Sequence, residues 1–77
     1  MEKLDCFNEF NKVINTIPIG STFQPPEIQA RIKWQTDFKL QPHDGTITRY
    51  IRKRRKLVGD LELANKRKSI YRRVERD

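Results

Sequence analysis

A chain of 77 residues has room for one small domain with a limited core, which we take to span residues 1–77. Its single cysteine excludes an internal disulfide framework, and no apolar run approaches the roughly 18 residues that cross a bilayer. The net charge of +7 is unevenly placed, since residues 1–42 hold five basic and five acidic residues whereas residues 43–77 hold twelve and five. This asymmetry indicates a cationic surface on the C-terminal half that suits a polyanion.

The first predicted element is an amphipathic helix over about residues 3–17. Its apolar residues follow each other at spacings of three, four and three, which places them on one helical face. They are Phe7, Phe10, Ile14 and Ile17. Pro18 and Gly20 come next and predict the end of the helix.

A short extended segment and a second helix are expected next. Residues 22–23, threonine and phenylalanine, suit an extended backbone, and the two prolines that follow disfavour a helix before Pro26. The second helix is predicted over about residues 26–35, because proline at the first helical position gives up no hydrogen bond. Ile28 and Ile32 form its buried edge.

Residues 35–43 form a connector in which Phe38 and Leu40 alternate with polar residues, so both side chains are expected to anchor on the core. Trp34, near the end of the second helix, has two interpretations. It packs against the core, which we favour, or it stands exposed as a contact for a partner. Pro42 prevents the connector from continuing as a helix.

The third predicted helix, over about residues 44–58, combines an apolar stripe with a run of cations. Asp44 is a good N-cap residue, and Gly59 is expected to end the helix. Arg54 falls on the apolar side and must extend along the edge of the core or pair with a carboxylate. Tyr50 also falls there, where core packing is the better interpretation than stacking on a base. The apolar side carries Ile47, Tyr50, Ile51 and Val58, and the opposite side carries Arg49, Arg52, Lys53 and Lys56.

A β-hairpin is predicted over about residues 60–74. Residues 60–63 alternate with period two, and residues 69–74 do so less regularly. Between them lie a turn-prone asparagine and three consecutive cations. Asp60 and Glu62 are expected to border the hairpin or to neutralise nearby arginines rather than to act as paired catalytic acids.

This order of elements resembles the winged helix-turn-helix family of DNA-binding domains. The resemblance is carried by residues 17–23 (IPIGSTF), residues 45–53 (GTITRYIRK) and residues 68–72 (KSIYR). It covers about residues 5–74 and implies an α+β fold, with three helices packed against a C-terminal hairpin, the wing. In that family the third helix enters the major groove of DNA, and the wing touches the backbone or the minor groove. Residue 54 is arginine here, where such helices usually have an aliphatic residue.

The chemistry of the third helix suggests how DNA contacts would be divided. A helix about 10 Å across fits a major groove that is about 12 Å wide. Arg49, near the N-terminus of the helix, is expected to reach base edges, with Thr46 and Thr48 at the margins. The other cations are expected to meet phosphates. They are Arg52, Lys53 and Lys56 on the helix, and Lys66, Arg67 and Lys68 at the wing tip.

The sequence suggests no catalytic residues, no metal site and no cofactor. One histidine and one cysteine fall short of a four-ligand zinc site, and the three glycines are isolated rather than grouped in a phosphate loop. We therefore expect a protein that is not an enzyme, takes no small-molecule ligand and does not bind membranes.

The favoured function is sequence-specific binding of double-stranded DNA by a small transcriptional regulator, bacterial or viral, in the cytoplasm (the nucleoid or a host cell). A lone module buries little DNA surface, so a homodimer or cooperative binding is expected. One alternative is a protein-interaction or assembly module that uses a basic face. RNA binding ranks lower, because it usually needs exposed aromatic side chains for stacking.

Overall fold

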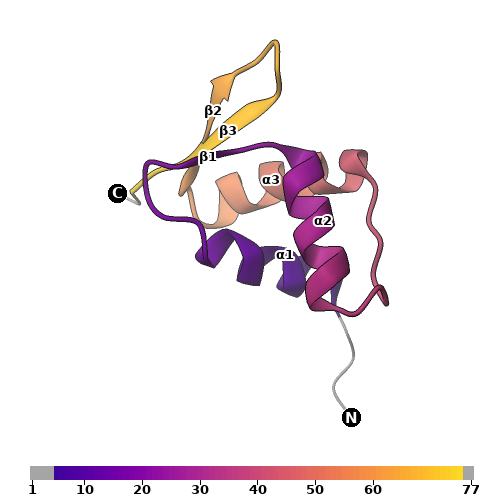
Figure 1. The fold of residues 1–77 in the computed structure, drawn as a ribbon. Helices are drawn as coiled ribbons and strands as arrows, with labels where there is room; N and C mark the ends of the chain where they lie inside the picture. Colours follow the sequence, from indigo (N-terminus) through magenta and orange to yellow (C-terminus); the bar gives the residue numbers. More distant parts are fainter. Residues whose placement is uncertain (1–4, 76–77) are drawn as a thin grey trace.

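Residues 5–75, which the computed structural model describes, form three helices and a three-stranded antiparallel sheet (Figure 1). Along the chain, α1 (Cys6–Asn15), β1 (Thr22–Phe23) and α2 (Pro25–Gln35) are followed by α3 (Asp44–Leu57), β2 (Leu61–Asn65) and β3 (Ile70–Arg73). The expected α+β class, with three helices and a C-terminal hairpin, is thus confirmed. No helix in this part of the chain is both long enough and apolar enough to span a bilayer.

Helix α1 is shorter than the predicted range of residues 3–17, of which residues 3 and 4 lie outside the described part of the chain. It begins after Asp5, whose carboxylate accepts hydrogen bonds from the backbone N–H groups of Phe7 (2.9 Å) and Asn8 (3.4 Å). It ends at Asn15, so the prediction that Ile17 is helical was wrong. Ile17 is nevertheless buried, because the chain turns back over the core after the helix.

Helix α2 starts at Pro25, one residue before the predicted Pro26, and it buries Ile28 and Ile32 as expected. The preference for a buried Trp34 was wrong, since 71% of this residue is exposed. Trp34 lies two positions beyond Ile32, or about 200° further round the helix, and therefore points away from the core.

The connector between α2 and α3 departs from the predicted alternation at one of its two apolar residues. Leu40 is half-buried and packs against the core, as expected. Phe38 is 45% exposed, so its predicted anchoring on the core was wrong. The reason is the backbone: Asp37 and Phe38 have φ angles of 54° and 64°, and alternation between two faces requires an extended chain.

Helix α3 begins at Asp44, so the expectation that Asp44 is the N-cap was wrong. The N-cap is His43, whose carbonyl accepts the first helical hydrogen bond from the N–H of Ile47 (3.1 Å). Asp44 sits in the first turn, where its negative charge suits the helix dipole. At the other end Gly59 has a φ of 78° and donates its N–H to the carbonyl of Arg54 (3.2 Å), as expected for a glycine that ends a helix.

The sheet has the order β1-β3-β2, so the strand between α1 and α2 pairs with the last strand of the chain. Phe23 faces Tyr71 across β1 and β3, and their rings stack with centroids 6.0 Å apart. The pairing of β2 with β3 is interrupted by a bulge between Leu63 and Asn65. The hairpin projects away from the helices, and only its base reaches the core (Figure 1). The buried core consists of Phe10, Val13, Ile14, Ile17, Phe23, Ile28, Ile32, Ile47, Ile51, Leu61 and Tyr71.

A buried charged cluster closes the fold where α1, α3 and the hairpin meet. Arg54 is 5% exposed, and its Nε and Nη2 atoms donate to the two carboxylate oxygens of Asp60 at 2.9 and 2.8 Å. The same guanidinium donates to the side-chain oxygens of Asn11 (3.0 Å) and Asn15 (2.9 Å) on α1. The prediction that Arg54 pairs with a carboxylate is confirmed, and Asp60 neutralises an arginine as expected.

We expect Asp60→Asn to lower the free energy of unfolding by about 3 kcal/mol or more, because it leaves the Arg54 charge buried without a counter-charge. Urea unfolding followed by circular dichroism measures this loss. Glu62→Gln is the matched control, since it breaks the exposed pair of Glu62 with Arg72 (2.9 Å) and should cost at most about 1 kcal/mol. Equal losses in the two variants would contradict a dominant role for the buried cluster.

Candidate nucleic-acid interface

The outer face of α3 carries exposed cations directly opposite its buried face. Arg49, Arg52 and Lys56 are exposed, whereas Ile47 and Ile51 on the inner side are completely buried. Within residues 5–75 these three cations form no ion pair with a carboxylate. The helix is therefore held by its inner side while its positive charges remain available to an external anion.

The two predicted threonines lie beside this face and are half-buried. The hydroxyl of Thr48 donates a hydrogen bond to the backbone carbonyl of Asp44 (3.0 Å), so its proton is already used within the helix. Its methyl group and the lone pairs of its oxygen are what it can offer to a ligand. Thr46 lies on the opposite flank, about 200° round the helix from Thr48.

One flank of α3 rests on α1 through aromatic rings. Tyr50 packs against both Phe7 and Phe10, with ring centroids 5.3 and 5.6 Å away, which confirms that it is a packing residue. Burial raises the pKa of Tyr50 above its ordinary value, and the neighbouring Cys6 side chain raises it further. The ammonium of Lys53 lies 4.4 Å from the centre of the Phe7 ring. Lys53 is thus exposed but partly committed to a cation–π contact within the protein.

The other flank of α3 contributes a cation that was not among the predicted site residues. Arg55 is exposed and, together with Arg52 and Lys56, lines a shallow hollow of about 330 Å³. Three positive side chains around one hollow can hold an anionic group such as a phosphate. Arg55 belongs to the basic run of the sequence, but it lies only about 80° round the helix from the buried Ile47. The sequence alone did not show that a side chain on this flank of the helix is exposed to solvent.

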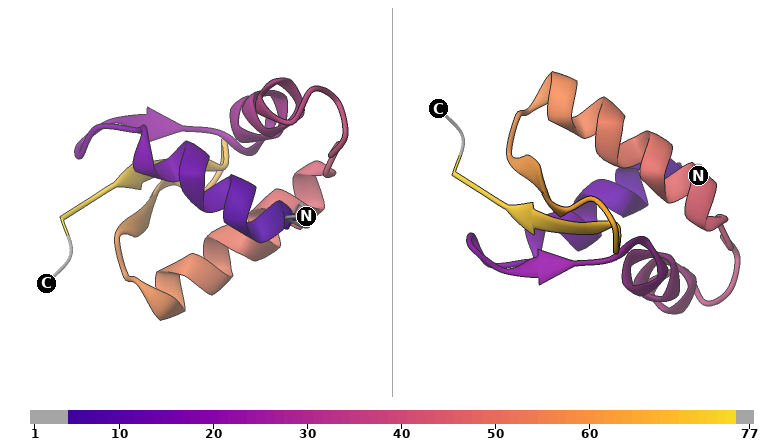
Figure 2. Two further views of the ribbon diagram at one scale, coloured as in Figure 1. Left: turned by 90° about the horizontal axis from the view of Figure 1, so that it is seen from below. Right: turned by 90° about the horizontal axis from the view of Figure 1, so that it is seen from above.

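The tip of the hairpin carries the three predicted wing cations, Lys66, Arg67 and Lys68, all of them exposed. The side chain of Asn65 accepts a hydrogen bond from the N–H of Lys68 (3.1 Å) and tightens the turn. The side chain of Gln24 donates to the carbonyl of Lys68 (3.0 Å), which ties the end of the hairpin to the start of α2. Seen from above, α3 and the hairpin lie on the near side of the molecule with α1 behind them (Figure 2, right).

Two arginines of β3 serve the protein itself. Arg72 pairs with Glu62 on the neighbouring strand (2.9 Å), so Glu62 neutralises an arginine as expected. The Nη1 atom of Arg73 donates to the backbone carbonyls of Ile14 (3.2 Å), Asn15 (3.2 Å) and Ile17 (2.7 Å). The carbonyls of Ile14 and Asn15 belong to the last turn of α1 and that of Ile17 lies just beyond it, so Arg73 caps the end of α1 from the last strand. No local sequence signal could have shown this contact, because it joins residues far apart in the chain.

The described part of the chain brings together no group of three or more histidine, cysteine or acidic side chains that could hold a metal ion. The two acidic residues at the start of the hairpin, Asp60 and Glu62, are each paired with an arginine. No protein-family model, no curated protein and no solved structure matches this chain. The arrangement of the residues themselves is therefore the basis for any functional conclusion.

The hydrogen bonds from Arg54 lower the pKa of Asp60 from its ordinary value of 3.8, and burial opposes them only in part. A lowered pKa in the folded state means that the carboxylate contributes stability above pH 3.8, which is lost as the pH falls through the folded-state value. We therefore expect the difference in free energy of unfolding between wild type and Asp60→Asn to shrink as the pH falls below 3.8 toward the lowered folded-state pKa. Urea unfolding at several pH values measures it, and parallel curves would contradict the assignment.

Proposed function

We propose that this chain is a winged helix-turn-helix protein that binds double-stranded DNA sequence-specifically, with α3 in the major groove and the β2–β3 hairpin as the wing on the backbone. The observation that carries the proposal is the outward set of Arg49, Arg52 and Lys56 on a helix whose inner side is fixed in the core. The order of helices and strands, including the short β1 between α1 and α2, is the order on which the family resemblance rests.

Duplex DNA suits this surface better than a point-like anion. The cations extend along α3 from Arg49 to Lys56, a rise of about 10 Å, which is comparable to the width of the major groove. The wing tip adds three more cations at a distance from the helix (Figures 1 and 2). A ligand that meets both must itself be an extended polyanion.

The proposed roles follow from the position of each residue on α3. Arg49 is the exposed arginine nearest the N-terminus of the helix, where side chains reach deepest into the groove, and it can donate two hydrogen bonds to guanine. Arg52 and Lys56, with Arg55 beside them, would hold a phosphate in the hollow that they line. Lys53 would contribute less to phosphate binding than the sequence implied, because its ammonium already makes a cation–π contact with Phe7.

A small transcriptional regulator, bacterial or viral, is the role that this binding supports best. A single module of this size covers a limited length of DNA, so we propose that two copies bind a repeated or palindromic site, as a homodimer or cooperatively. The site of action would be the cytoplasm, at the nucleoid or at viral DNA in a host cell.

Selection from random duplex DNA, with structured RNA and single-stranded DNA as competitors, tests the proposal. We expect one enriched duplex motif. On that motif the logarithm of affinity should fall against the logarithm of salt concentration with a slope of roughly −4 to −6, as expected when about five to seven phosphates are neutralised. Loss of binding to the RNA competitor, or a slope near zero, would contradict the proposal.

Two single substitutions separate base reading from phosphate binding. Arg49→Ala should cost about 1–3 kcal/mol on the enriched motif and relax the sequence preference, because it removes contacts to base edges. Arg67→Ala at the wing tip should weaken binding to all duplexes alike and make the salt slope shallower by about one. Fluorescence anisotropy with the motif and with a scrambled duplex measures both effects. Identical behaviour of the two variants would show that the roles are wrongly divided.

A further inference from the structure

Two aromatic side chains stand in contact with each other on the surface, at the end of α2. Trp34 is 71% exposed and Phe38 is 45% exposed, and their rings meet edge to face with centroids 4.9 Å apart. A single exposed apolar residue is common on protein surfaces. Two large rings in contact form a contiguous apolar patch, whose exposure to water is unfavourable. Neither ring contributes to the buried core.

The backbone holds this pair in place. Asp37 and Phe38 both have positive φ angles, a conformation that aspartate tolerates but that a bulky residue such as phenylalanine seldom adopts. Hydrogen bonds fix the turn: the N–H of Phe38 donates to the carbonyl of Lys33 (2.8 Å), and the N–H of Asp37 donates to that of Trp34 (3.2 Å). An ordered turn thus keeps the Phe38 ring against the indole instead of against the core.

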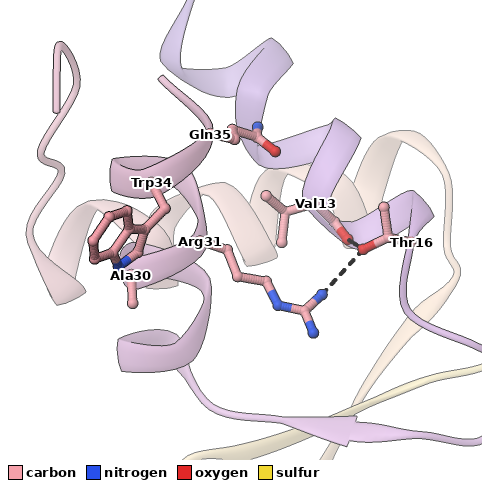
Figure 3. Close-up of a pocket in the computed structure, with 6 residues that line it drawn as sticks. All are labelled: Val13, Thr16, Ala30, Arg31, Trp34 and Gln35. Carbon is pink, nitrogen blue, oxygen red and sulfur yellow. Dashed lines mark hydrogen bonds between the residues drawn. The ribbon is translucent and has the colours of Figure 1, made fainter. Parts of the chain in front are cut away.

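A hollow of about 430 Å³ opens beside the indole, between α1 and α2 (Figure 3). Val13 and Ala30 give it apolar walls, and Trp34 bounds one side. On the other side the guanidinium of Arg31 reaches toward α1 and donates one hydrogen bond to the hydroxyl of Thr16 (3.1 Å; Figure 3). Within residues 5–75 Arg31 pairs with no carboxylate, so most of its five N–H donors remain for a ligand.

The charge around the patch selects between possible occupants. Residues 27–40 contain three cations, Arg31, Lys33 and Lys39, and two acidic residues, Glu27 and Asp37, a net charge of +1. A second copy of the chain would bring two such positive surfaces together, which disfavours self-association. DNA is also a poor fit, because the patch is largely apolar and the end of α2 lies at the opposite end of the molecule from the wing tip (Figure 1).

We propose that the Trp34–Phe38 patch and the hollow beside it bind an acidic segment of a partner protein. An aliphatic or aromatic side chain of that segment enters the hollow against Trp34, and a neighbouring carboxylate pairs with the guanidinium of Arg31. The partner can be held while the wing is occupied by another ligand, because the end of α2 lies at the opposite end of the molecule from the wing tip (Figure 1). This assignment does not depend on the identity of the ligand of α3.

Random dodecapeptides displayed on phage are the probe. They are selected on the immobilised full chain and counter-selected on the Arg31→Gln, Trp34→Ala double variant, which removes peptides that bind the basic face of α3. We expect enriched peptides in which aspartate or glutamate neighbours an apolar residue. Enrichment of peptides without acidic residues, or no enrichment over the double variant, would overturn the proposal.

An enriched peptide is then titrated against single variants. Trp34 is the only tryptophan of the chain, so its emission should shift to shorter wavelength as the peptide covers it. With labelled peptide, Arg31→Gln should raise the Kd about tenfold and Trp34→Ala at least about thirtyfold. Arg52→Gln, the matched loss of one exposed arginine on α3, should change the Kd less than about twofold. An equal effect of Arg52→Gln would overturn the proposal.

Two further measurements test whether the variants fold and whether a second copy of the chain covers the patch. Trp34 and Arg31 are exposed, so thermal unfolding of both variants should match that of the wild type. If Trp34→Ala fails to fold, Arg31→Gln and the emission of the wild type still decide the question. Sedimentation equilibrium tests for the competing occupant: a dimer of the wild type that is lost in Arg31→Gln would show that a second copy covers the patch, and would overturn the proposal.

Discussion

The buried guanidinium of Arg54 is the interaction on which the rest of the structure depends. It joins α3 to Asp60, just before the hairpin, and to Asn11 and Asn15 on α1. A buried ion pair often adds little net stability compared with apolar packing, but the loss of one partner leaves a desolvated charge. Arrangements that separate any of these elements are therefore costly. The cluster fixes the base of the hairpin relative to the outer face of α3, and with it the distance between the two cationic regions.

The cations of the C-terminal half divide into two groups with different tasks. Arg54 and Arg73 are turned inward, toward Asp60 and toward the end of α1. These contacts explain how a short chain with a limited core closes its helices and its sheet onto one another. The net charge thus overstates the number of cations that can meet a ligand. The exposed cationic face excludes Arg54 and Arg73 and gains Arg55, and it is well defined because the inward arginines hold the elements that carry it.

The spacing of the apolar residues predicted correctly which side chains of α3 are buried, but it did not do so at the end of α2. Both outcomes have physical reasons. In α3 a long amphipathic pattern determines which side chains enter the core, so the burial of Ile47 and Ile51 and the exposure of Arg49 could be predicted. For Trp34 the same helical geometry pointed outward from Ile32, so the favoured core packing was wrong. The position of Phe38 could not be predicted, because nothing in the local sequence indicates a left-handed turn without glycine. Arg55 was missed for a related reason, since the packing of neighbouring elements decides whether a flank stays open.

Preorganisation connects the fold to both proposed surfaces. Binding is weakened by every side chain and loop that must become ordered in the complex. Here α3 is fixed by Arg54 and by the rings that hold Tyr50, and the hairpin is tied at its base by β1 and near its tip by Gln24. The aromatic patch is fixed in turn by the hydrogen-bonded turn at Phe38. What remains to be ordered on either surface is mainly the long side chains of lysine and arginine, so their charges can favour association without large changes in the backbone.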